Sequence, residues 1–123
     1  MILKLDIVDG EYAIVRLAPD APMPAWASGH VVSVTWTPDQ CSVICDASAV
    51  PDAEQSEKGW RCFKVHGDLG FSAVGTVDAI AQPLRAARIS IFVVSTFDTD
   101  YIFVHSKQFD EACRVLKAAG HIL

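Results

Sequence analysis

Residues 87–106 read A-R-I-S-I-F-V-V-S-T-F-D-T-D-Y-I-F-V-H-S, and the rest of the chain can be arranged around them. Two apolar runs, Ile89 to Val94 and Tyr101 to Val104, flank the polar segment Ser95 to Asp100. Both runs are rich in the β-branched and aromatic residues that strands prefer. Asp and Thr in the polar segment favour tight turns. The pattern predicts a β-hairpin, and we expect its tip to bind a ligand rather than to catalyse a reaction.

The chain has 123 residues, which suits one compact domain or two very small ones. Hydrophobic residues make up 51%, so a sizeable core is expected. The net charge of −5 and the absence of a basic cluster disfavour nucleic acid as a partner. No apolar run approaches the roughly 18 residues of a membrane span. The first residues lack the apolar core of a signal peptide, so we expect a cytoplasmic protein without membrane partners.

The four cysteines form no recognisable metal or redox motif, because no pair has the two-residue spacing of zinc or thioredoxin-type sites. Cys41 and Cys45 lie in one strand-like run, which separates them by roughly 13 Å, too far for a disulfide. We expect all four cysteines to be reduced and to act as small apolar residues.

The first half of the chain predicts mostly strands. Asp9-Gly10 is a strong turn signal, so we expect an N-terminal hairpin there. Three prolines between Pro19 and Pro24 exclude a regular helix or central strand from that segment. The polar residues 46–59 are expected to form a linker. The predicted strands of this half cover residues 2–8, 11–18, 31–36 and 41–45.

The second half alternates strands and helices. A strand over residues 60–65 and a turn over residues 66–70 precede a helix that begins at Ser72, its N-cap. The apolar stripe of this helix is Val74, Val77, Ala81 and Leu84. The hairpin follows, and then a second helix over residues 107–119, with Phe109, Ala112, Cys113, Leu116 and Ala119 on its buried face. Gly120 is its expected C-cap, and residues 121–123 could add a last strand.

The order from Trp60 is therefore β-α-β-β-α-β. This is the split βαβ, ferredoxin-like arrangement: an α+β fold whose antiparallel sheet carries both helices on one face. The first half could be a reduced copy of the same unit.

The sequence offers little for catalysis. Asp98 and Asp100 would share one face of a continuing strand, and paired carboxylates can perform acid–base chemistry or bind a metal. The four histidines are scattered, however, and the Walker, G-x-S-x-G and H-E-x-x-H patterns are absent. We therefore predict no enzyme activity, no catalytic residue, no metal site and no cofactor.

Binding has a better physical basis. Gly67, Gly70 and Gly75 surround a strand-to-helix junction, where free N–H groups favour a carboxylate. The strand from Ile89 is expected to be parallel and adjacent to the strand from Trp60, so the hairpin tip should meet this junction. N–H donors on one side and carboxylates on the other suit a zwitterion such as an α-amino acid. Alternatively, the glycines only form turns and the aspartates only solubilise the hairpin.

Residues 75–80 (G-T-V-D-A-I) together with residues 83–104 strongly resemble the ACT-domain family. The nearest branch resembles small bacterial ACT proteins related to the eukaryotic CASTOR arginine sensors. Three upstream segments match as well: residues 11–26, 33–46 and 57–67. The resemblance implies two tandem ACT units, a degenerate, strand-rich unit over residues 1–58 and a C-terminal ACT domain over residues 59–123. It also implies sensing of a small molecule, usually an amino acid, and a homodimer, because ACT sheets associate.

In the arginine sensors the ligand lies at an interface between ACT units, between the loop entering the first helix and the segment after the second strand. Carried over by resemblance and position, the expected ligand-binding residues are Gly70, Phe71, Ser72, Gly75, Thr76, Thr96, Phe97, Asp98 and Asp100. The sensors have a second acid where this chain has Ala73, so we do not predict specificity for arginine. The alternative function is an ACT-fold module for homo-oligomerisation or partner binding, without a small ligand.

Overall fold

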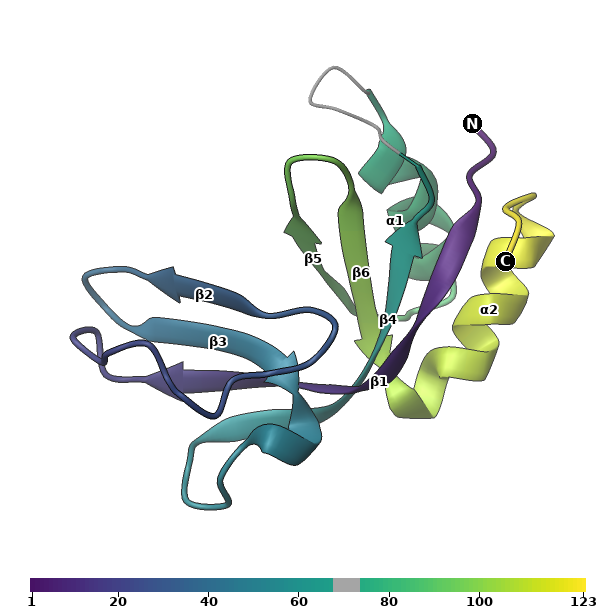
Figure 1. The fold of residues 1–123 in the computed structure, drawn as a ribbon. Helices are drawn as coiled ribbons and strands as arrows, with labels where there is room; N and C mark the ends of the chain where they lie inside the picture. Colours follow the sequence, from purple (N-terminus) through teal and green to yellow (C-terminus); the bar gives the residue numbers. More distant parts are fainter. Residues whose placement is uncertain (68–73) are drawn as a thin grey trace. The chain divides into compact units, whose positions relative to one another are not determined.

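The computed structural model describes residues 1–67 and 74–123 (Figure 1). The strands are β1 (Leu5–Leu17), β2 (Ser33–Trp36), β3 (Cys41–Asp46), β4 (Ser56–Val65), β5 (Ile91–Ser95) and β6 (Asp100–His105). The α-helices are α1 (Thr76–Ala86) and α2 (Phe109–Ala118), and short 3-10 helices cover Ala47–Ala49 and Ser106–Gln108. Within the described residues, no helix is long and apolar enough to span a membrane.

The chain divides into two compact units. The helical unit comprises Met1–Val8 together with Arg61–Leu123, and the strand unit comprises Asp9–Trp60. Strands β1 and β4 each contribute residues to both units. That the two units are tandem ACT repeats divided after residue 58 stays a prediction.

The sheet of the helical unit has the strand order β1-β4-β6-β5. Strands β5 and β6 form the predicted antiparallel hairpin, with Ile91 opposite Val104 and Ser95 opposite Asp100. Because β6 lies between β4 and β5, the prediction that the strand from Ile89 is adjacent to the strand from Trp60 is wrong. In a split βαβ unit, another strand inserts between the two parallel strands.

The core of the helical unit lies between the sheet and both helices. Alternate sheet residues point into it, including Phe63 and Val65 of β4. Helix α1 contributes Ile80 and Leu84 to the same cluster, and α2 contributes Leu116. Both helices therefore cover one face of an antiparallel sheet, as the sequence predicted.

Helix α1 differs from its prediction in its start and in its buried face. It begins at Thr76, whereas the predicted N-cap, Ser72, lies outside the described residues. Its buried residues are Thr76, Ile80 and Leu84, of which Leu84 was predicted correctly, while Val77 is 37% exposed and Val74, before the helix, is 84% exposed. The apolar residues of this segment recur at spacings of three and four along more than one stripe of the helix. The sequence pattern therefore predicted a stripe next to the one that is buried. On α2 the prediction is correct for Phe109, Ala112 and Leu116; Cys113 packs against the core from an intermediate position, and Ala119 is exposed.

The two chain ends meet in the helical unit. His121 is buried; its Nδ1 accepts a hydrogen bond from the Leu3 amide at 3.0 Å, and its Nε2 donates to the Ala79 carbonyl at 2.9 Å. Gly120, with φ of 100°, ends α2 in a Schellman motif, in which the His121 amide donates to the Leu116 carbonyl. Instead of the predicted last strand, Ile122 forms a single parallel bridge with Lys4.

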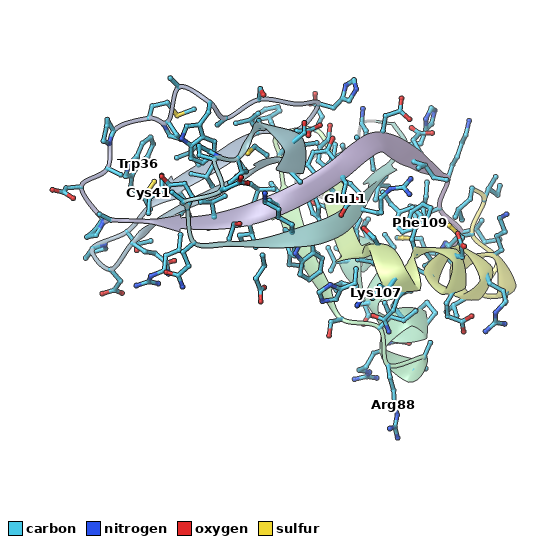
Figure 2. The ribbon with its side chains drawn as sticks, turned by 90° about the horizontal axis from the view of Figure 1, so that it is seen from below. Glu11, Trp36, Cys41, Arg88, Lys107 and Phe109 are labelled. Atoms are coloured by element: carbon cyan, nitrogen blue, oxygen red, sulfur yellow. The ribbon has the colours of Figure 1, made fainter. Side chains whose placement is uncertain are left out.

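The strand unit has the order β2-β3-β1-β4. Strand β3 pairs antiparallel with both neighbours, and Trp36 of β2 lies opposite Cys41 of β3 (Figure 2). The core of this unit consists of Ala13, Val15, Cys41, Val43, Cys45 and Val50. Asp9–Trp60, all of which the structure describes, contains no α-helix, in agreement with the strand-rich prediction.

Two predictions for this half are wrong. The expected N-terminal hairpin is one continuous strand, β1, in which Gly10 has a φ of 100°. The reason is that Tyr12–Leu17 pair with β3, whereas the Lys4 carbonyl accepts from His66 beyond β4, so neither half of β1 folds back on the other. The expected linker also ends early, because β4 already begins at Ser56.

Candidate ligand site

The tip of the β5–β6 hairpin is closed by two threonines. The Thr96 amide and Oγ1 both donate to the Thr99 carbonyl, at 2.9 and 2.8 Å, and the Thr99 amide donates to Thr96 Oγ1 at 3.3 Å. Thr96 therefore has a structural role in the turn. Phe97 and Asp98, between them, are exposed, with 77% of Phe97 accessible to solvent. Asp100 is half-buried at the start of β6, opposite Ser95.

Thr99 joins this tip to the end of β4. Its side chain is buried, and Oγ1 donates to the Val65 carbonyl at 2.7 Å. Val65 is the last residue of β4, from which the chain continues toward α1. The hairpin tip thus lies at the end of the sheet where β4 ends, while the predicted meeting of the tip with Gly70–Gly75 involves residues outside the described part of the chain and stays a prediction. The sequence analysis missed Thr99 because its partner is far away along the chain.

Replacing Thr99 with valine should lower the free energy of unfolding by about 1–3 kcal/mol, because the shape is retained while the buried Val65 carbonyl loses its donor. Urea denaturation measures the loss. Thr35→Val is the matched control: Thr35 is exposed in β2, so its replacement should change stability by less than about 0.5 kcal/mol. Equal effects of the two substitutions would show that the hydroxyl of Thr99 does not hold the tip.

The start of α1 has a glycine N-cap and a buried hydroxyl for which the described residues supply no partner. Gly75 is the N-cap, with φ of 82° and no side-chain cap, and a Cβ placed there would meet nothing within 4 Å. The first amides of any α-helix lack intrahelical acceptors. Thr76 is only 5% exposed, yet its Oγ1 has no hydrogen-bond partner among the described residues. Asp78 in the first turn accepts from Gln82 at 2.9 Å.

The predicted site residues thus divide into three groups. Gly70, Phe71 and Ser72, and also Ala73, lie outside the described residues. Gly75 and Thr76 lie at the start of α1, which Figure 1 shows at the end of the sheet that also carries the hairpin residues Thr96, Phe97, Asp98 and Asp100. Within residues 1–67 and 74–123, no three His, Cys, Asp or Glu residues are grouped so that they could hold a metal ion.

Two sequence models of known domains match parts of this chain. The sequence model of the ACT domain matches residues 55–118, and a model of an N-terminal domain matches residues 10–53. The human cytosolic arginine sensor for mTORC1 subunit 1 is 39% identical over 59 residues. That match covers 47% of this chain but only 18% of the length of the sensor.

Solved structures show the same fold. A crystal structure of an Agobacterium tumefaciens protein is 40% identical, has a TM-score of 0.94, and aligns with 100% of this chain and 92% of its own. The ligand-free regulatory subunit of aspartate kinase from Thermus thermophilus has a TM-score of 0.67 at 9% identity, covering 98% of this chain and 99% of its own. At that identity the likeness concerns the fold alone.

Proposed function

Because this chain belongs to the ACT-domain family, we propose that it is a non-catalytic regulatory protein that binds an amino acid. The proposed site lies at an ACT interface, between the loop entering α1 and the tip of the β5–β6 hairpin. The name of the related human protein, a cytosolic arginine sensor, supports both an amino-acid ligand and a cytoplasmic location.

The observation that carries the proposal is the buried, unpartnered Oγ1 of Thr76 at the start of α1. A buried hydroxyl without a partner is costly, and a ligand carboxylate would accept its hydrogen bond. The uncapped amides of the first turn favour the same negative charge. Across the site, the carboxylates of Asp98 and Asp100 have no partner among the described residues, so they can receive the ammonium group.

A thermal-shift screen of the standard amino acids tests the proposal. An amino acid at 100 times its dissociation constant should stabilise the protein by about 2.7 kcal/mol. Asp100→Ala should abolish this shift, because Asp100 is proposed to hold the ammonium group. Asp39→Ala, in an exposed turn of the strand unit, should leave it unchanged. If dialysed protein responds to no amino acid, the proposed function fails; if Asp100→Ala still responds fully, the site lies elsewhere.

The second candidate function is that of a homo-oligomerisation or partner-binding module. The position of β5 at the edge of the sheet favours this function. This strand ends the β1-β4-β6-β5 order, so one of its sides carries backbone groups that no strand within residues 1–67 and 74–123 pairs. We propose that the protein forms a homodimer and that the strand unit is a degenerate ACT unit in tandem with the helical unit. Sedimentation equilibrium measures the dimer; a dimer without any amino-acid response would favour this second candidate.

A further inference from the structure

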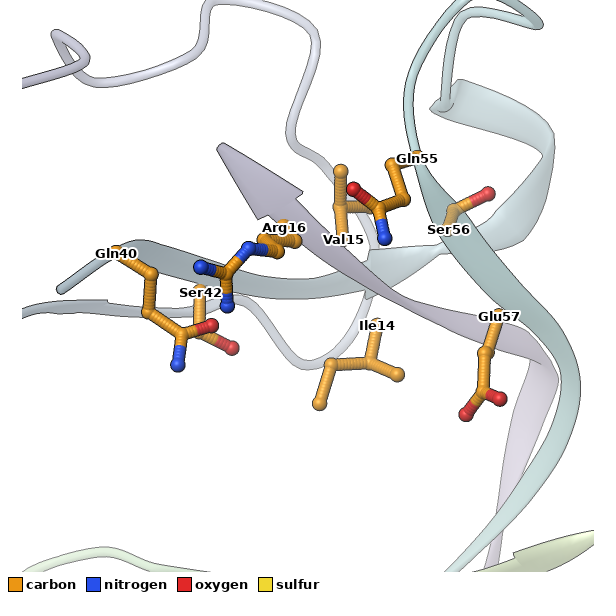
Figure 3. A pocket seen from close by; sticks show the side chains of 8 residues that line it. All are labelled: Ile14, Val15, Arg16, Gln40, Ser42, Gln55, Ser56 and Glu57. Atoms are coloured by element: carbon orange, nitrogen blue, oxygen red, sulfur yellow. The ribbon is translucent and has the colours of Figure 1, made fainter. Parts of the chain in front are cut away.

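The strand unit contains a pocket of about 270 Å³, and none of its lining residues belongs to the proposed amino-acid site (Figure 3). It is lined by Ile14, Val15, Arg16, Gln40, Ser42, Gln55, Ser56 and Glu57. Side chains alternate along β1, so Ala13 and Val15 enter the core of the unit while Ile14 and Arg16 point to the other face. The pocket therefore has an apolar floor and charged ends.

Strand pairing fixes the backbone positions from which Arg16 and Glu57 extend. Arg16 is directly opposite Ser42 of β3, and its amide donates to the Gln55 carbonyl, at the start of β4, at 3.0 Å. Glu57 lies two residues further along β4, diagonal to Arg16. Diagonal neighbours on adjacent antiparallel strands are about 7–8 Å apart. Figure 3 shows the Arg16 guanidinium beside Gln40 and Ser42, with Glu57 beyond Ile14.

Both charges are available to a ligand. Within residues 1–67 and 74–123, the structure records no hydrogen bond or ion pair for the guanidinium of Arg16 or the carboxylate of Glu57. A guanidinium binds a carboxylate through two parallel hydrogen bonds, and the Gln40 amide and Ser42 hydroxyl can add donors there. Glu57 can accept from a cationic amine at the other end.

We propose that this pocket binds a small zwitterion whose carboxylate and amino group are separated by an aliphatic chain. Arg16 holds the carboxylate, Glu57 holds the amine, and Ile14 packs against the methylene groups between them. Because these diagonal strand positions are about 7–8 Å apart and a C–C bond is about 1.5 Å, several methylene groups must separate the two charges of the ligand. An α-amino group beside its carboxylate is too close to meet both charges, so glycine fits poorly.

A series of ligands of increasing chain length tests the proposal: glycine, 4-aminobutanoate and 6-aminohexanoate are titrated into the 123-residue protein, and backbone amide resonances are followed by NMR. We expect 6-aminohexanoate to shift the amides of Arg16, Ser42 and Glu57 saturably, and glycine to bind at least tenfold more weakly. Equal responses to glycine and 6-aminohexanoate, or no response at these amides, would overturn the proposal.

Substitutions of the pocket residues test whether 6-aminohexanoate binds in this pocket. Arg16→Gln and Glu57→Gln should each weaken 6-aminohexanoate binding at least tenfold, whereas the neighbouring exposed change Lys58→Gln should not. Asp100→Ala should leave this binding intact, so the result is independent of the amino-acid site. Unchanged binding to Arg16→Gln, or lost binding to Asp100→Ala, would refute the assignment of the pocket.

Discussion

Replacing Phe63 with alanine should lower the free energy of unfolding by about 3–5 kcal/mol. Phe63 is completely buried in the core of the helical unit, and its ring stacks on Phe109 with centroids 5.1 Å apart. The substitution removes the transfer free energy of the ring and leaves a cavity between β4 and α2. Because small proteins are stable by only about 5–15 kcal/mol, this loss approaches the whole stability. Urea denaturation at low temperature measures it.

Phe97→Ala is the matched control, because the same side chain is removed from the exposed hairpin tip. It should change stability by less than about 0.5 kcal/mol but weaken the response to the amino-acid ligand. If Phe63→Ala unfolds the protein completely, Phe63→Leu should show a smaller, measurable loss of about 1–1.5 kcal/mol. A loss from Phe97→Ala as large as that from Phe63→Ala would contradict the assigned core.

Raising the pH above 9 should destabilise the protein through Cys62. This thiol is fully buried, and burial raises its pKa from an ordinary 9.0 to about 12. Between these values the unfolded chain loses the thiol proton while the folded protein keeps it, so alkali favours unfolding. The stabilising contribution is complete below pH 9 and falls by about 1.4 kcal/mol per pH unit, or about 4 kcal/mol by pH 12.

Cys62→Ala isolates this effect from other groups that titrate in alkali. Urea denaturation of both proteins at pH 8, 9 and 10 should show a smaller fall in stability for the variant than for the native protein. In Cys113→Ala the difference should be smaller, because nearby Lys117 and Arg61 counteract the burial that raises the pKa of Cys113. Parallel pH dependences of the native protein and Cys62→Ala would rule out the buried thiol as the cause.

Local pattern was sufficient for much of the fold. The β5–β6 hairpin follows from two β-branched and aromatic runs around an Asp- and Thr-rich turn. Helix α2 follows from its apolar spacing and from Gly120, whose positive φ ends it. All four cysteines are free, as expected from their spacing.

The sequence predicts the candidate site only as two segments, and the site itself stays a prediction. The glycines before α1 and the polar hairpin tip were expected at one end of the sheet, and the bond from Thr99 to Val65 places the tip there. Neither the buried Thr99 nor the unpartnered Thr76 hydroxyl could be recognised, because burial depends on residues distant in the sequence. The Arg16 and Glu57 pocket was missed for the same reason, since its two charges lie on different strands.

Turn chemistry and side-chain periodicity, which act over a few residues, established most of the order of strands and helices, whereas the resemblance to ACT domains rests on the particular residues of segments such as 75–80 and 83–104. They could not establish the partners of those elements. Gly10 permits a turn, yet β1 continues through it because β3 and β4 supply hydrogen-bonding partners along its length. Likewise, β6 lies between β4 and β5 because pairing there satisfies the backbone hydrogen-bonding groups of strands that are far apart in the chain. The buried face of α1 depends on packing, because it is the face that buries apolar surface against distant segments.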